Sequence, residues 1–212
     1  MIFLTQAPAR DISASAVAIK IALMSIADAQ LWHHKIQPAA TKANGSDRKW
    51  NWPSMRRWLP LSEIAFGRRA PAYTVWAEAT NNKAVPVGMV LLSEGYASLD
   101  GSSKKSVYMW FMSAAPDSVM RENGLSVIPK LGRVLIDIGV THSHNCGYGG
   151  RIGLHAAPEG GDKLFAFYKH IGMSLLPGSA ILPKLSRIND GRYFYFDALQ
   201  AKKWSDSLNS YR

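Results

Sequence analysis

Residues 106–126 read SVYMWFMSAAPDSVMRENGLS, and they contain the transition on which our interpretation of the fold depends. Residues 106–115 are almost wholly apolar, which is typical of a strand that is covered on both faces and therefore central in its sheet. Gly124 then precedes a helix that we expect over residues 125–141. The unpaired N–H groups and the dipole of a helix start attract phosphate oxygens. A single glycine before a helix more often marks a plain turn, so an anion-binding loop here needs support from the rest of the chain.

Hydrophobic periodicity divides the rest of the chain into helices and strands. We expect helices over 13–32, 54–66 and 160–171, strands over 72–79, 87–93, 151–157 and 192–198, and a polar connector over 37–53. The first two of these strands form a predicted hairpin. The order of elements predicts an α/β fold with a mixed sheet flanked by helices. No repeat or domain boundary is apparent, so we expect a single domain over 1–212, with a helical part at 1–70 and a core sheet at 72–200.

Charge and cysteine content narrow the choice of partner and compartment. The chain of 212 residues has a formal net charge of +10, and residues 1–70 hold ten Lys/Arg against four Asp/Glu. We favour a solvated surface, with a docking face for nucleic acid or another anion as the alternative. The single cysteine, Cys146, excludes an internal disulfide and predicts a reducing, cytoplasmic compartment. The apolar stretch 14–27 is too short for a membrane span and contains Lys20, so we expect no membrane partner.

The order of elements resembles the GNAT superfamily of N-acetyltransferases. The cofactor motif of that family, Gln/Arg-x-x-Gly-x-Gly/Ala, follows its fourth strand, and Arg121, Gly124 and Ser126 fit its three positions. Ser126 departs from the usual Gly or Ala. An alternative alignment uses residues 132–135, but it leaves Lys130 at an expected glycine and places the loop inside a helix. We prefer the first alignment, and the resemblance then implies that the coenzyme A diphosphate is bound by Arg121, Glu122, Asn123, Gly124, Leu125 and Ser126.

A second block, residues 151–173, resembles the fifth strand of the family and the helix that follows it. Tyr168 falls on the family tyrosine that protonates the departing coenzyme A thiolate. Gly161 stands where the family often has Asn, and Leu164 where it often has Ala. The resemblance implies a central mixed sheet with two splayed central strands, and acetyl-CoA as the acyl donor. It covers about residues 72–200 and is strongest over 106–173.

The chemistry of acyl transfer fits this arrangement. Transfer from a thioester needs a deprotonated amine, a polarised carbonyl and protonation of the departing thiolate. A backbone N–H of Met112 or Ala114 at the strand split would polarise the carbonyl, and Tyr168 would act as general acid unless it is simply a core tyrosine. The general base stays open, either as a water relay or as one of Glu78, Glu94, Asp117 and His155.

We therefore expect an N-acetyltransferase that moves an acetyl group from acetyl-CoA to a primary amine by direct transfer in a ternary complex. The acceptor, a small molecule or a protein, is not readable from the sequence. The departures at Ser126 and Gly161 motivate one alternative, a catalytically silent GNAT fold that serves as a binding module. The basic N-terminal region motivates another, a nucleic-acid-associated protein. Aromatic residues in the last strand would also suit the edge of a homodimer.

His142, His144 and Cys146 alternate in a glycine-rich stretch. Nitrogen and sulfur ligands suit zinc, but this spacing matches no standard pattern and no fourth ligand is obvious, so we predict no metal site.

The tryptophans Trp50, Trp52 and Trp58 are interleaved with Arg56 and Arg57. Such residues can stack on bases, pack a helix against the edge of a sheet, or shape the pocket of the acceptor.

Overall fold

The computed structural model describes residues 2–7, 17–43, 45–79, 82–180, 182 and 189–212. Its described strands form one mixed sheet of eight in the order β1-β2-β3-β4-β5-β6-β8-β7. Among these described strands, β5 and β6 alone pair in parallel, and every other neighbouring pair is antiparallel. The strands are β1 (Gln6–Ala7), β2 (Val17–Leu23), β3 (Ala72–Glu78), β4 (Ala84–Ala97), β5 (Lys105–Ala114), β6 (Ile152–His155), β7 (Ser174–Leu175) and β8 (Tyr193–Phe196).

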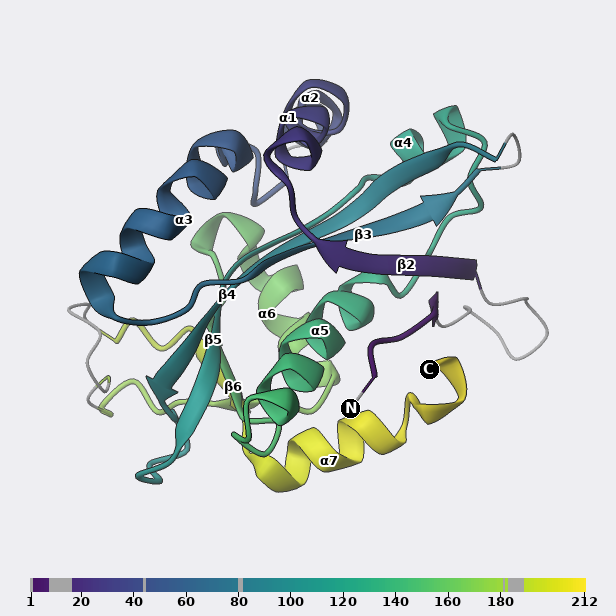
Figure 1. Ribbon diagram of the computed structural model, residues 1–212. Coiled ribbons are helices and arrows are strands. Elements are labelled where there is room, and N and C mark those ends of the chain that lie inside the picture. Colours follow the sequence, from purple (N-terminus) through teal and green to yellow (C-terminus); the bar gives the residue numbers. More distant parts are fainter. Residues whose placement is uncertain (1, 8–16, 44, 80–81, 181, 183–188) are drawn as a thin grey trace.

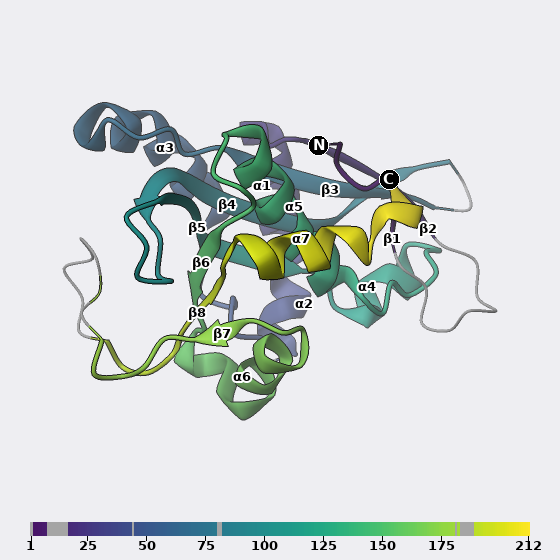
Figure 2. The same ribbon diagram turned by 90° about the horizontal axis from the view of Figure 1, so that it is seen from below.

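Helices cover both faces of this sheet (Figure 1). Helices α1, α2 and α3 lie on one side, and α5 and α7 lie on the other, as the view from below also shows (Figure 2). The two ends of the chain meet, and the Thr5 N–H donates to the Tyr211 carbonyl at 2.9 Å. The helices are α1 (Ile26–Lys35), α2 (Gln37–Lys42), α3 (Trp52–Phe66), α4 (Asp117–Glu122), α5 (Leu131–Asn145), α6 (Gly161–His170) and α7 (Ala198–Asp206), with short 3-10 turns at Pro158–Gly160 and Asn209–Tyr211. The α/β class predicted from the sequence is confirmed.

The long helix α5 packs directly on the central strands. Its stripe of Leu131, Leu135 and Ile138 is buried, as the periodicity predicts. Gly139 permits a close approach to β5, because a Cβ at this position would lie 2.6 Å from the Met109 sulfur. Among the described residues no helix is long and apolar enough to cross a membrane.

The predicted helix over 13–32 is wrong in its described first part, whereas residues 26–32 do belong to helix α1. Residues 17–23 form strand β2, in which Ile19 pairs with Ala77 and Ile21 with Val75. β-branched residues at alternate positions fit a pleated strand better than a helix, and pairing with β3 decides between the two. The helix α1 begins only at Ile26, after a capping box made by Ser25 and Asp28. The predicted cap, Ser13, lies outside the described residues.

The helix predicted to start at residue 125 starts instead at Leu131. Pro129 explains the difference, because proline lacks an N–H and disfavours helical geometry in the residue before it. Upstream, residues 117–122 form the short helix α4, which the sequence analysis did not anticipate, and Gly124 follows it with a left-handed φ of 70°. The predicted loop over 141–150 is also shorter, because α5 continues to Asn145.

The remaining core elements agree closely with their predictions. The β3–β4 hairpin, the central position of β5, and helices α3 and α6 are all confirmed. Gly172, with a φ of 87°, follows α6 as expected. The short strands β1 and β7 and the helix α7 were not predicted. In the predicted connector 37–53, residues 37–42 form α2.

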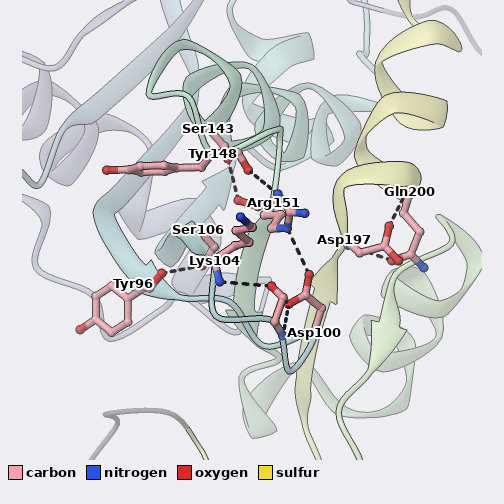
Figure 3. A network of polar contacts seen from close by, with 10 residues as sticks. Tyr96, Asp100, Lys104, Ser106, Ser143, Tyr148, Arg151, Asp197 and Gln200 are labelled. Atoms are coloured by element: carbon pink, nitrogen blue, oxygen red, sulfur yellow. Dashed lines mark hydrogen bonds and ion pairs between the residues drawn. The ribbon is translucent and has the colours of Figure 1, made fainter.

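Arg151 joins three segments just before β6 (Figure 3). Its Nε lies 3.2 Å from Asp100 Oδ2, in the turn between β4 and β5, and its Nη1 donates to the Tyr148 carbonyl at 3.2 Å. The Ser143 hydroxyl of α5 donates to the Arg151 carbonyl at 2.7 Å. Burial acts to raise the pKa of Asp100, but hydrogen bonds from Ser102 and Arg151 outweigh it and lower this pKa, so the carboxylate stays charged. This network stabilises the β5–β6 pair at the end where the ladder between the two strands begins.

Candidate active site

The two central strands, β5 and β6, diverge after three residue pairs. Strand β5 pairs with β6 only at Val107–Ile152, Tyr108–Gly153 and Met109–Leu154, whereas β5 continues to Ala114. The divergence coincides with a β-bulge. On β4, Leu92 lies opposite Met109 and Leu91 lies opposite Phe111, so the register of the ladder steps over Trp110. A bulge bends its strand and increases the local twist, which carries the end of β5 away from β6.

The bulge also reverses the direction in which the backbone N–H groups of β5 point. Before it, the Val107 N–H donates to the Arg151 carbonyl at 3.0 Å, on the β6 side. After it, the Ala115 N–H donates to the Val87 carbonyl of β4 at 2.8 Å. Because alternate residues of a strand point to opposite sides, the N–H groups of Met112 and Ala114 are directed away from β4 and toward the opening.

A cavity of about 540 Å³ fills this opening. Its walls come from both sides of the sheet, as a cavity that passes between two strands requires. The sheet contributes residues 108–114 of β5 and the end of β6 at 154–155. The other walls are Gly132 and Leu135 of α5, Leu164, Phe167 and Tyr168 of α6, residues 157–159, and the loop residues Gly45, Ser46, Asp47 and Trp50 before α3.

Tyr168 lies in this wall and is only 3% exposed. Its ring packs against Phe167 and Phe194, with centroids 5.4 and 5.3 Å away. Burial raises the pKa of Tyr168, so its hydroxyl keeps its proton at neutral pH and can donate it. Among the described residues, none forms a hydrogen bond with this hydroxyl, which leaves it available to a group inside the cavity.

The six residues Arg121–Ser126, predicted to bind the diphosphate, are not in the walls of the cavity. The backbone amides of this segment instead donate hydrogen bonds to carbonyls in the last turn of α4. The Gly124 N–H donates to the Arg121 carbonyl at 3.0 Å, and the Leu125 N–H donates to the Met120 carbonyl at 2.9 Å. The segment that does line the cavity is the start of α5 at Gly132, which belongs to the alternative alignment. Two other predicted residues, Met112 and Ala114, are in the cavity wall.

Of the four candidates for the general base, His155 alone lies in the cavity wall among the described residues. Its Nε2 lies 2.9 Å from Asp190 Oδ2, and its side chain is 21% exposed. Burial acts to raise the pKa of Asp190, but the hydrogen bonds from the His155 side chain and the Arg192 backbone help to outweigh it and lower this pKa. Glu78 is exposed at the end of β3, Asp117 pairs with Arg121 at 3.8 Å, and Glu94 contacts His142 at 2.9 Å.

Asp47 is a cavity residue that the sequence analysis did not single out. It is 7% exposed, and burial raises the pKa of its carboxyl group. Its Oδ2 is buried without a hydrogen-bond partner among the described residues. The one sequence signal nearby is the tryptophan cluster. Trp50 lines the cavity and packs edge-on against Phe111 at 4.9 Å, whereas Trp52 is fully buried and Trp58 is 65% exposed.

Comparisons with known proteins add a likeness of fold. No protein-family model and no curated protein sequence matches the chain. A GNAT-family acetyltransferase from Staphylococcus aureus Mu50 matches with a TM-score of 0.51 and 14% identity, over 85% of this chain and 99% of that chain. An acetyltransferase from Streptococcus agalactiae 2603 gives 0.50 and 13%, over 84% and 96%. A tyrosine-to-phenylalanine mutant of the AtaT toxin, bound to the C-terminus of the antitoxin AtaR and acetyl-CoA, gives 0.50 and 13%, over 90% and 98%. The fold that the sequence resembles is therefore confirmed.

Proposed function

We propose, from the premise that this chain has the GNAT fold, that it is an N-acetyltransferase which transfers an acetyl group from acetyl-CoA directly to a primary amine. The observation that carries this proposal is the cavity between the diverging ends of β5 and β6, with Tyr168 in its wall. A gap between two strands exposes backbone groups that a continuous sheet would pair. Those groups, and a protonated tyrosine beside them, supply two of the requirements of acyl transfer.

The diphosphate of the donor would bind at the start of α5. Gly132 lies in the cavity wall, and the N-cap residue Lys130 makes no side-chain cap. Among the described residues, none accepts a hydrogen bond from the Gly132 N–H. A helix of 15 residues directs the positive end of its dipole to this point. Gly132 also leaves room, because a Cβ there would lie 3.1 Å from the Phe167 ring.

The protein groups then divide the chemistry among them. The N–H groups of Met112 and Ala114 would stabilise the negative charge that develops on the acetyl oxygen. As the amine nitrogen bonds to the acetyl carbon and the carbon–sulfur bond breaks, Tyr168 would give its proton to the sulfur. His155 would accept the proton that the amine loses, with Asp190 fixing the orientation of its ring.

Asp47 would hold the amine before reaction. A buried carboxylate with one oxygen unpartnered is costly to desolvate, and a cationic amine would relieve that cost. Trp50 lies in the same wall and packs on β5 through Phe111. This side of the cavity, formed by the segment before α3, is therefore proposed as the acceptor side, with a small or flexible primary amine as its ligand.

Calorimetry with acetyl-CoA and the purified chain tests the proposal. We expect one binding site, and Gly132→Leu should abolish the binding because the larger side chain fills the start of α5. The matched control is Ser126→Leu, which places the same side chain on an exposed residue of the segment that the sequence favoured. A folded wild-type protein that does not bind acetyl-CoA, or a loss with Ser126→Leu alone, would contradict the proposal.

A further inference from the structure

We propose that Glu94, His142 and Cys146 form a binding site for a divalent transition-metal ion, with Zn²⁺ as the best match. This site is separate from the acyl-transfer cavity and does not depend on the proposed function. The Glu94 carboxylate, the His142 imidazole and the Cys146 thiol each offer one ligand atom, and these atoms lie within 4.8 Å of one another. His142 and Cys146 are apparent as possible ligands from the sequence alone, whereas Glu94 lies 48 residues before His142.

Two of the ligands come from one face of α5. His142 occupies its last turn and Cys146 is its C-cap, and residues four apart on a helix point to the same side. His142 Nε2 lies 3.5 Å from Cys146 Sγ and 2.9 Å from Glu94 Oε1. Ligand atoms bound to a tetrahedral zinc ion at about 2.0–2.3 Å are roughly 3.3–3.8 Å apart. The three groups therefore need only small side-chain movements to surround an ion.

A neighbouring residue holds the His142 ring in the orientation that metal binding needs. Tyr73 Oη lies 2.9 Å from His142 Nδ1, and the Tyr73 side chain is itself buried. If Nδ1 carries the proton and donates it to the Tyr73 oxygen, the lone pair of Nε2 points toward Glu94 and Cys146. Histidine ligands of metal ions commonly make such a hydrogen bond through their other nitrogen.

His144, the third residue of the sequence motif, does not join this group. A Cβ on Gly150 would lie 2.5 Å from His144 Nε2, so the His144 side chain packs against the segment before β6. Burial lowers the pKa of His144, which is consistent with a neutral packed ring. His144 is therefore a matched control: it has the same chemistry and lies two residues from a ligand.

The chemical types of the ligands decide which ion fits. Nitrogen and sulfur ligands with one carboxylate suit Zn²⁺ and related transition ions, whereas Ca²⁺ and Mg²⁺ prefer oxygen ligands. Three protein ligands leave one position open for water. The site is accessible at its edge, since the side chains of His142 and Glu94 are 11% and 12% exposed. Arg69 approaches Glu94 at 3.9 Å, but its side chain is 80% exposed and can turn into solvent when a cation binds.

The place of the site in the fold indicates what a bound ion would do. It would join strand β4, through Glu94, to the C-terminal end of α5. His142 lies ten residues after Gly132 on this helix, which corresponds to about 15 Å along the axis. An ion here would stabilise the packing of α5 on the sheet without entering the acyl-transfer cavity.

Titration of chelator-treated protein with Co²⁺ tests this inference. We expect a thiolate-to-cobalt charge-transfer absorption in the near ultraviolet and the visible bands of tetrahedral cobalt, both displaced by one equivalent of Zn²⁺. Cys146→Ser and His142→Gln should each remove the charge-transfer band, and Tyr73→Phe should weaken Zn²⁺ binding about 10- to 100-fold. His144→Gln should bind like the wild type, and Zn²⁺ should raise the melting temperature of both.

Several results would overturn the inference. One is a folded wild-type protein that gives no charge-transfer band, and another is a Cys146→Ser protein that retains Zn²⁺ affinity. A third is an equal loss of Zn²⁺ affinity with His144→Gln and with His142→Gln. Retained Zn²⁺ affinity without the thiolate band would assign the ion to another group of side chains, such as His33 and His34, which are neighbours in α1. Acetyl-CoA binding, measured on the same variants, should not change, so the outcome here is distinguishable from a failure of the proposed function.

Discussion

Met109 of β5 lies opposite Leu154 of β6, and this pair is the last rung of the parallel ladder between them. The next residue of β5, Trp110, is the bulged one, and the next residue of β6 is His155. The same point in the sheet therefore ends the pairing, turns the Met112 and Ala114 N–H groups toward the opening, and places a histidine at its edge. The cavity follows from one extra residue in a central strand.

Replacement of Tyr168 by phenylalanine should separate catalysis from binding and from stability. We expect kcat to fall about 100-fold or more, which is typical of the loss of a general acid. Acetyl-CoA affinity and the melting temperature should change little, because the ring keeps its contacts with Phe167 and Phe194 and the lost hydroxyl has no described protein partner. Release of free thiol from acetyl-CoA, followed with a panel of primary amines, measures kcat.

Full activity in the Tyr168→Phe protein would assign the proton transfer to another group. Binding of acetyl-CoA without turnover in the wild-type protein, with any amine, would instead favour the catalytically silent module.

Replacement of Asp47 by asparagine should weaken binding of the acceptor amine and increase the stability of the fold. Loss of a charge-assisted hydrogen bond of about 1.5–3 kcal/mol predicts an amine KM roughly 10- to 100-fold higher, with little change in the KM for acetyl-CoA. Because burial raises the Asp47 pKa, the folded state holds this proton more tightly than the unfolded state. The protonated Asp47 carboxyl group therefore contributes stability in acid, and this contribution is lost as pH rises from about 4, the ordinary pKa of aspartate, through the raised pKa of the folded state.

The asparagine variant lacks this loss, so its free energy of unfolding at neutral pH should exceed that of the wild type, and its pH dependence above pH 4 should be flatter. Urea unfolding at several pH values measures both. An unchanged amine KM would remove Asp47 from the acceptor side.

Local sequence patterns are sufficient to predict some elements of this fold and not others. Strand β5 and helix α6 were predicted correctly because their patterns agree with their tertiary environment. The continuous apolar run of β5 requires cover on both faces, and Phe167 and Tyr168 lie on the cavity side of α6. Strand β2 was predicted as a helix because apolar residues at positions 17, 21 and 24 also fit helical spacing, and only its pairing with β3 decides the matter.

The site was only partly predictable because its members come from distant segments. Tyr168 could be named from the resemblance, and Met112 and Ala114 from the chemistry expected at the strand split, and each of the three lies in the cavity wall. The position of the helix start depended on Pro129, which the motif alignment overlooked. Asp47 lies in a polar connector with no pattern of its own, and the His155–Asp190 contact joins residues 35 positions apart.

Cys146 should react slowly with alkylating reagents in metal-free protein. Burial, followed by the neighbouring Glu94 charge, raises the pKa of the Cys146 thiol to about 11. The thiolate is the nucleophile, so the rate of iodoacetamide alkylation should stay low at neutral pH and keep rising through pH 10. Mass spectrometry of the single cysteine at each pH measures the rate. Glu94→Gln should shift the profile to lower pH, whereas a plateau near pH 8 in the wild type would contradict this environment.

The buried pair of Asp137 and Arg212 should control global stability. Arg212 Nη2 lies 2.8 Å from Asp137 Oδ1, Asp137 is fully buried, and Thr141 donates a further hydrogen bond to it at 3.2 Å. Arg212→Met leaves that carboxylate buried without its cation, so we expect the free energy of unfolding at neutral pH to fall by about 3–5 kcal/mol. Adding Asp137→Asn to this variant should recover most of the loss.

The pH dependence gives this last prediction a second readout. Burial already raises the pKa of Asp137 against the opposing effect of Arg212, and removal of the arginine should raise it further. A carboxyl group with a raised folded pKa contributes stability that is present in acid and is lost as pH rises through that pKa. The deficit of Arg212→Met relative to the wild type should therefore shrink toward pH 4, and Asp137→Asn should abolish this trend. Equal stability of Arg212→Met and the wild type at neutral pH would mean that Asp137 is already neutral in the native protein.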